Sequence, residues 1–197
     1  MAVEENFDRK YTTSNPFIKL LVKRFFKCIE EMLSEIEFKR VLETGCGPGF
    51  STQYLKKFLR DKDFEASDLK ENLVKEARKR NSEVRISQES IYDLKREDNS
   101  FDLIIALEVL EHLEEPEAAL KELYRVTSRF CLLSIPNEPL WRILNMCRLA
   151  YLKDFGNTPG HIQHWSKRQF ANFLQNYFKI NKITMSLPWI IALVEKK

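Results

Sequence analysis

Only five of the chain's 197 residues are glycine, and three of these stand within the segment Glu43-Thr44-Gly45-Cys46-Gly47-Pro48-Gly49. Glycine adopts backbone conformations that other residues avoid, and without a side chain it lets a ligand approach the main chain closely. The segment lies between a strand-like stretch, residues 40–43, and a helical pattern over residues 51–60. In an open α/β sheet, ligands bind beyond the carboxyl ends of the strands. The cluster therefore predicts a cofactor-binding loop after the first strand.

The spacing of the glycines separates the cofactor classes that use such a loop. A phosphate-binding nucleotide loop ends in Gly-Lys-Ser/Thr, whereas here Phe50 precedes Ser51-Thr52 and no lysine is present. A dinucleotide loop has the pattern G-x-G-x-x-G, and counted from Gly45 its third glycine would fall at Phe50. The observed pattern, an acidic residue followed by G-x-G-x-G, fits neither class.

The elements that position this loop are visible as alternating patterns along the chain. Ser14-Asn15-Pro16 predicts the start of an N-terminal helix, because a capping residue precedes a proline that suits the first turn. From residue 40 onward, helices are expected over residues 51–60, 71–80 and 116–126, and further helices near Leu140 to Met146 and after Ser166. Strands are expected over residues 40–43, 64–68, 84–87, 101–106, 130–135, 178–184 and 189–194.

This alternation predicts βαβ units and a parallel sheet. Ser186-Leu187-Pro188, between the last two strands, is too short for a helical crossover, so that pair is expected to be antiparallel. We predict an α/β fold with a doubly wound, seven-stranded, mostly parallel sheet that ends in an antiparallel C-terminal hairpin.

In its glycine cluster and in the order of its strands and helices, the chain resembles the class I S-adenosylmethionine-dependent methyltransferases. Glu43 to Gly49 matches the first motif of that family, and Asp68 follows at the end of the second strand. Residues 88–91 match the segment that lines the adenine, residues 99–106 match the fourth strand, and residues 107–113 match the stretch that passes the methionine end of the cofactor. The nearest likeness is to the branch that contains quinone-biosynthesis and other small-molecule methyltransferases.

The resemblance implies a Rossmann-like fold, S-adenosyl-L-methionine as cofactor and S-adenosyl-L-homocysteine as product. Asp68 is expected to accept hydrogen bonds from the ribose hydroxyls, although it could instead cap the following helix. Glu43 is expected either to order the loop or to approach the ammonium group of the methionine moiety. The cofactor-binding residues implied are Glu43, Thr44, Gly45, Cys46, Gly47, Gly49, Asp68, Leu69, Glu89, Ser90, Ile91, Leu107 and Glu108.

A second set of residues is expected to bind the methyl acceptor. His112 is the one histidine within the matched motifs, and an imidazole is suited to act as a general base near neutral pH, although a structural histidine is the alternative. His161 and His164 follow a Gly/Pro loop that could cover the pocket; no metal is predicted, because no third ligand is evident nearby. Trp165 either joins this substrate side or packs as a hydrophobic staple before Ser166. Trp141, in the apolar stretch 136–151, and Tyr11 complete the candidates for substrate binding.

The function expected is in-line transfer of a methyl group to an O, C or N atom of a small-molecule acceptor, which the apolar stretch suggests is apolar or aromatic. The alternatives are an RNA methyltransferase, because basic clusters occur at Lys56-Lys57 and Arg78-Lys79-Arg80, a catalytically silent binding module, and a dehydrogenase. DNA is not expected as a partner, because the Asn/Asp-Pro-Pro-Tyr motif after the fourth strand is missing.

The composition is typical of a soluble globular protein. Thirty-two basic and 29 acidic residues give a net charge of +3, too small to argue for nucleic acid by itself. No apolar run approaches the roughly 18 residues of a membrane span, the N-terminus does not resemble a signal peptide, and four scattered cysteines suggest a cytoplasmic location. We expect one domain over residues 1–197: an N-terminal helical segment (1–37), a cofactor-binding core (38–136), an acceptor-side lid with helices (137–177) and the terminal hairpin (178–197).

Overall fold

The computed structural model describes residues 9–147, 155–158 and 160–197. Its sheet confirms the predicted fold class, with seven strands in the order β3-β2-β1-β4-β5-β7-β6. The first five strands pair in parallel, and β7 runs antiparallel to both β5 and β6. The strands are β1 (Arg40–Thr44), β2 (Asp63–Asp68), β3 (Arg85–Gln88), β4 (Phe101–Leu107), β5 (Thr127–Pro136), β6 (Phe178–Ser186) and β7 (Trp189–Lys196).

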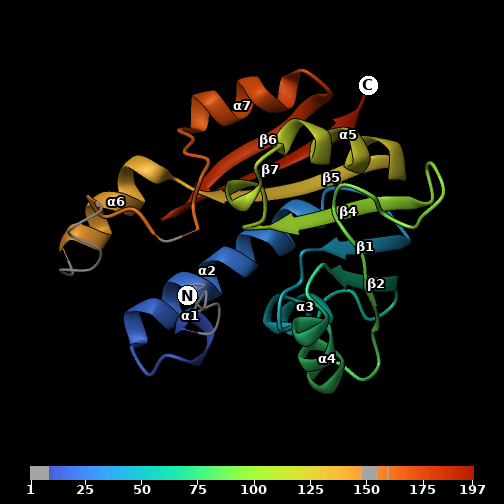
Figure 1. Cartoon of the computed structure of the whole chain (residues 1–197), viewed down its shortest axis with the longest axis horizontal. Helices are drawn as coiled ribbons and strands as arrows, with labels where there is room; N and C mark the ends of the chain where they lie inside the picture. Colours follow the sequence, from blue (N-terminus) through green and yellow to red (C-terminus); the bar gives the residue numbers. More distant parts are fainter. Residues whose placement is uncertain (1–8, 148–154, 159) are drawn as a thin grey trace.

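Helices cover both faces of this sheet (Figure 1). The helices are α1 (Arg9–Thr12), α2 (Pro16–Leu33), α3 (Phe50–Leu55), α4 (Glu71–Arg80), the 3₁₀ turn η1 (Leu110–His112), α5 (Pro116–Val126), α6 (Glu138–Cys147) and α7 (Lys167–Gln175). Figure 1 shows α5 and α7 on one side of the sheet and α2, α3 and α4 on the other. Helices α1 and α6 lie at the edge toward which β1 and β4 point, which is the edge where the loops after these strands meet.

The central strands are apolar on both sides because both sides are covered. In β4, Leu103 and Ile105 pack in the core shared with α2, whereas Ile104 and Ala106 pack in the core shared with α5 and α7. All four side chains are fully buried. The sheet is therefore a rigid support whose carboxyl edge holds the loops.

Local sequence signals set the ends of several helices. Asn15 caps α2, its side chain accepting a hydrogen bond from the backbone N–H of Phe17 at 2.9 Å, and Pro16 occupies the first turn. Ser166 caps α7 in a capping box with Gln169, as predicted. The predicted helix 51–60 is wrong at its end, since α3 stops at Leu55 and tighter turns follow.

The apolar stretch 136–151 contains α6, whose last described residue is Cys147; the predicted lid residues 148–151 lie outside the described residues. Within the described ranges, no helix combines the length and the hydropathy that crossing a membrane would require.

Candidate functional site

A pocket of about 320 Å³ opens at the carboxyl ends of β1, β2 and β4. Small-molecule sites typically enclose roughly 300–1,000 Å³, so this pocket has room for one ligand. The predicted cofactor residues that line it are Thr44, Gly45, Cys46, Gly47, Asp68, Leu69, Glu89, Ser90, Ile91, Leu107 and Glu108. Glu43 and Gly49 are not among the lining residues.

Asp68, at the end of β2, is held by two backbone groups. Its Oδ2 accepts a hydrogen bond from the N–H of Gly47 at 2.8 Å, and its Oδ1 accepts one from the N–H of Lys70 at 2.9 Å. The contact with Lys70 orders the turn before α4, but the N-cap of α4 is Lys70 and no side chain caps the helix, so the predicted alternative that Asp68 caps this helix is wrong. An ionised carboxylate can accept about four hydrogen bonds, and two donors therefore leave capacity for hydroxyl groups of a ligand in the pocket.

The three clustered glycines are required for three different reasons. A β-carbon on Gly45 would lie 2.5 Å from Val109 Cγ2, so this glycine lets the segment after β4 pack against the loop. A β-carbon on Gly47 would meet nothing within 4 Å. Gly47 lines the pocket, so that β-carbon would occupy space open to a ligand.

Gly49 serves helix packing. Its φ is +84°, and a β-carbon there would lie 2.6 Å from Asn81 Nδ2 and 2.9 Å from Ala77 Cα. Asn81 is fully buried at the end of α4 and donates to the carbonyl of Gly49 at 2.9 Å. The prediction that Gly49 approaches the cofactor is therefore corrected: its position ties the start of α3 to α4.

Glu43 lies beneath the loop, with 1% of its surface exposed. Its Oε2 accepts a hydrogen bond from the Thr52 hydroxyl at 2.6 Å, whereas Oε1 has no partner among the described residues. Burial raises the pKa of this carboxyl to about 7. Of the two predicted roles, the geometry supports ordering of the loop, because the side chain joins β1 to α3 outside the pocket lining.

Helix α1 closes one side of the pocket. Lys10 Nζ lies 2.5 Å from Glu108 Oε1, and the Tyr11 ring stacks on Phe50 with centroids 5.2 Å apart. All four residues line the pocket. Tyr11 and Glu108 were predicted, whereas Lys10 and Phe50 were missed. No sequence signal marks Lys10, since its partner lies 98 positions away in the chain.

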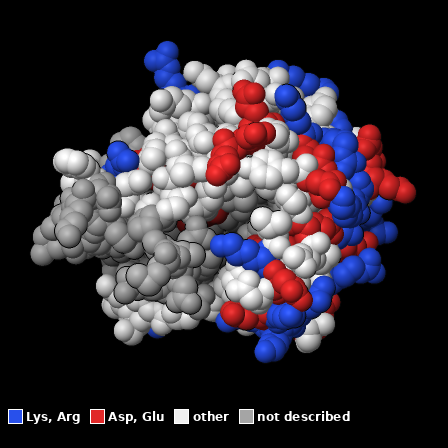
Figure 2. Space-filling model, viewed as in Figure 1, with Lys and Arg blue, Asp and Glu red and all other residues white. Residues whose placement is uncertain are grey.

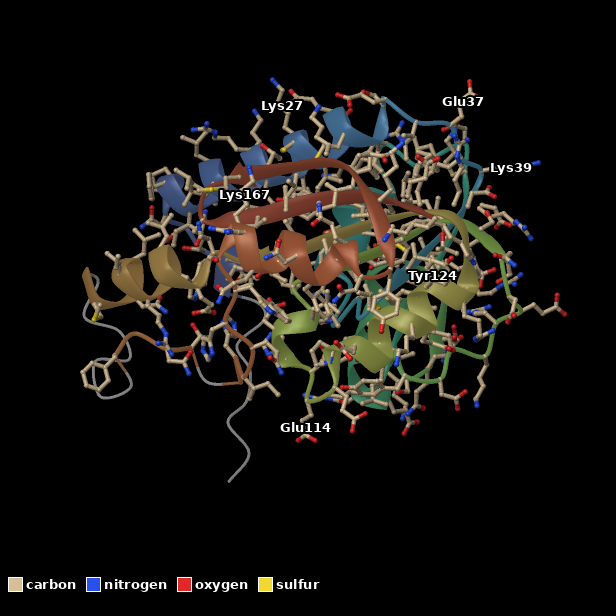
Figure 3. The ribbon with its side chains drawn as sticks, turned by 90° about the horizontal axis from the view of Figure 1, so that it is seen from above. Lys27, Glu37, Lys39, Glu114, Tyr124 and Lys167 are labelled. Atoms are coloured by element: carbon tan, nitrogen blue, oxygen red, sulfur yellow. The ribbon has the colours of Figure 1, made fainter. Side chains whose placement is uncertain are left out.

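The glutamates that follow β4 in the sequence divide into two groups. Glu108, with φ +56°, faces the pocket, and Glu111 in η1 is 1% exposed. Burial, reinforced by the charge of Glu108, raises the pKa of Glu111 well above its usual value. Glu114 instead points away from the molecule before α5 (Figure 3). Of these three glutamates, Glu108 and Glu111 therefore lie near the site.

Of the predicted acceptor-side residues, the structure brings His112, His161 and Trp141 together. His112 lines the pocket, and its ring lies 5.0 Å from the ring of His161. The ring of Trp141 lies 6.4 Å from that of His161, and its indole N–H donates to Thr158 Oγ1 at 2.8 Å. His161 is buried and its Nδ1 lies 2.6 Å from Glu138 Oε1.

The other two predicted acceptor-side residues lie elsewhere. His164 is exposed, and its Nε2 contacts Asn157 Oδ1 at 2.9 Å. Trp165 packs on Phe170 and Phe173 of α7, with ring centroids 5.9 and 5.4 Å apart. Since Trp165 precedes the capping Ser166 and meets the fourth residue of the helix, it forms a hydrophobic staple, and the predicted substrate contact of Trp165 is corrected accordingly.

Known proteins that are similar to this chain include methyltransferases. Residues 42–133 match the family model of a methyltransferase domain. The chain is 40% identical over 102 residues to an uncharacterized methyltransferase of Schizosaccharomyces pombe, a match that covers 45% of this chain and 36% of that protein. The chain spans well under half the length of the curated relatives that it matches.

Solved structures share the fold over nearly the whole chain. A Pyrococcus horikoshii protein superposes with a TM-score of 0.73 at 16% identity, covering 97% of this chain and 96% of that one. A SAM-dependent methyltransferase from Aquifex aeolicus superposes with a TM-score of 0.69 at 18% identity, covering 96% and 98%. Residues 42–133 therefore resemble a methyltransferase domain, and the whole chain shares its fold with these solved structures.

Proposed function

We propose that this chain transfers a methyl group by in-line displacement from S-adenosylmethionine to a nucleophilic O, N or C atom of a small-molecule acceptor. The observation that carries the proposal is the pocket wall where Gly47 leaves space beside a backbone-oriented Asp68. The cofactor supplies a methyl group on a sulfonium sulfur, which is already an activated leaving group. The chain's own task is then to position the reactants and exclude water, which can contribute roughly 7–11 kcal/mol.

The residues present fit this cofactor. The Asp68 carboxylate suits a pair of ribose hydroxyls, because both of its oxygens are fixed by backbone donors and retain lone pairs. Glu89, Ser90 and Ile91 line the pocket after β3, where an adenine would lie. Helix α1 excludes water on the opposite side through Lys10 and Tyr11.

We place the acceptor beside Tyr11 and His112, which both line the pocket. An acceptor that is already nucleophilic needs no base, whereas a hydroxyl acceptor gains from a group that takes its proton. His112 is the candidate for that role on this wall.

A small molecule is favoured over RNA by the charge distribution. Figure 2 shows acidic and basic side chains interspersed on the part of the visible face that carries α3, α4 and α5, so this face presents no extended basic surface. Binding of RNA depends on neutralising phosphates and weakens steeply with salt. Retention of the protein on immobilised RNA at low and high salt tests this alternative.

The cofactor assignment is tested by calorimetric titration with S-adenosylmethionine, S-adenosylhomocysteine and NAD. We expect S-adenosylmethionine and S-adenosylhomocysteine to bind. Asp68→Asn should lower their binding affinity roughly 10- to 100-fold, since a hydrogen bond to a charged group contributes about 1.5–3 kcal/mol. Asp61→Asn is the matched control, because Asp61 is exposed in the turn before β2, at the other end of that strand from Asp68. Binding of NAD alone would favour a dehydrogenase, and no binding at millimolar concentration would overturn the assignment.

A further inference from the structure

We propose that a divalent transition-metal ion binds between Glu111, His112 and His161, at the border of the pocket. One ligand atom from each of these three side chains lies within 4.8 Å of the others. Two of the residues belong to η1 after β4, and the third stands in the loop before α7. Two imidazoles and one carboxylate form a ligand set that is common for catalytic zinc and for non-haem iron.

Glu111 gives the first independent reason. The side chain is 1% exposed, and neither carboxylate oxygen accepts a hydrogen bond from the residues that the structure describes. Burying a carboxylate without partners is costly. A bound cation would satisfy both oxygens, which have no donor among residues 9–147, 155–158 and 160–197.

The histidines give the second reason. His112 Nδ1 lies 2.9 Å from the carbonyl oxygen of Gly160. A carbonyl only accepts, so Nδ1 carries the proton and the lone pair of the neutral ring is on Nε2. His161 Nδ1 lies 2.6 Å from the carboxylate of Glu138, which orients that ring in the same way. Ligand histidines in metal sites almost always donate their other N–H to a carbonyl or a carboxylate.

The backbone holds the two segments together without an ion. The N–H groups of Ile162 and Gln163 both donate to the carbonyl of Glu111, at 2.9 and 3.0 Å. The ligand residues therefore approach each other through main-chain bonds that do not depend on the charges of their side chains, and the site is pre-organised.

This chemistry selects the ion and suggests its use. Imidazole ligands suit Zn²⁺, Fe²⁺ and other first-row ions better than Mg²⁺ or Ca²⁺, and three protein ligands leave coordination positions open. His112 lines the pocket, so an ion held there borders the proposed acceptor position. This use of the ion rests on the proposed function. It implies an acceptor with an oxygen atom that coordinates the ion, and His112 then acts as a metal ligand instead of a base.

The test is titration of the chelator-treated protein, residues 1–197, with Zn²⁺ by calorimetry and with Co²⁺ by visible absorption. We expect one equivalent to bind. Glu111→Gln and His161→Ala should each lower the affinity more than Glu138→Gln, which orients a ligand and should cost about 10- to 100-fold. His164→Ala is the matched control, because His164 stands on the same loop outside the ligand set.

Absence of stoichiometric binding by the wild-type protein would overturn the proposal, as would equal losses in His164→Ala and His161→Ala. In that case the buried Glu111 carboxyl has no cation to satisfy it, and Glu111→Gln should fold with at least the stability of the wild type. Binding of S-adenosylmethionine, measured without metal, is read separately. A protein that binds the cofactor but no ion contradicts the metal site alone, and one that binds the ion but no cofactor contradicts the proposed function alone.

Discussion

Replacing Glu43 by glutamine should make the protein more stable at neutral pH. Glutamine has nearly the same shape, and its amide oxygen can still accept the hydrogen bond from Thr52. The pKa of Glu43 is about 7 in the folded chain because the side chain is buried, against an ordinary value of 4.5. The folded state therefore binds this proton more tightly than the unfolded state does.

The sign and size of the effect follow from that difference. A raised pKa stabilises the folded protein fully below about pH 4.5, and the contribution is lost as the pH rises through about 7. One pH unit corresponds to about 1.36 kcal/mol, so wild type should lose roughly 2–3 kcal/mol relative to Glu43→Gln between about pH 5 and about pH 8. For a domain stabilised by about 5–15 kcal/mol, this is a large fraction.

Urea unfolding of both proteins at the two pH values measures the difference, with Glu114→Gln on the surface as the control for loss of a charge. The quantity compared is the free energy of unfolding of the variant minus that of wild type. If this difference does not change with pH, Glu43 is ionised in the folded protein and the reasoning from burial is refuted.

Three further predictions concern the pocket and its surroundings. Gly47→Ala should fold, with a free energy of unfolding lowered by about 1–2 kcal/mol because of its left-handed conformation, yet bind S-adenosylmethionine poorly in calorimetry. Gly49→Ala should instead be strongly destabilised in urea unfolding, because its β-carbon would meet α4. Lys10→Met should lower the free energy of unfolding by about 1–3 kcal/mol, since it leaves Glu108 without its charged partner, and hydrogen exchange should show faster opening of α1. Trp165→Ala should lower the melting temperature with unchanged cofactor affinity, because the ring packs on α7; a selective loss of affinity would contradict the staple.

The elements that could be predicted from the sequence are those whose signal is local. Helix α5 has the predicted bounds, residues 116–126, because proline marks its start and its buried face has a helical period. Strand β5 begins at Thr127, three residues before its predicted start, because Thr127 pairs with Phe101 across the sheet. That pairing is non-local, and no pattern within residues 127–130 announces it.

At the site, the glycine cluster likewise combines a local signal that could be predicted with tertiary contacts that could not. Its position after β1 could be predicted, because strand–glycine–helix is a local pattern. The distinct reasons for Gly45, Gly47 and Gly49 depend on Val109, on open pocket space and on Asn81 respectively, and these neighbours are set by tertiary packing. A common role for all three glycines was therefore the simplest prediction and a wrong one for Gly49.

The histidines are the residues whose grouping could least be predicted from the sequence. Spacing along the chain pairs His161 with His164, and judged by that pair a metal site lacks a third ligand. In the folded chain His161 instead meets His112 and Glu111, about fifty positions earlier, because the carbonyl of Glu111 receives two N–H groups from the loop before α7. A ligand set assembled by such main-chain bonds leaves no spacing motif in the sequence. Its only local trace is Glu111, a charged residue between Leu110 and His112 that the fold buries without a hydrogen-bond partner among the described residues.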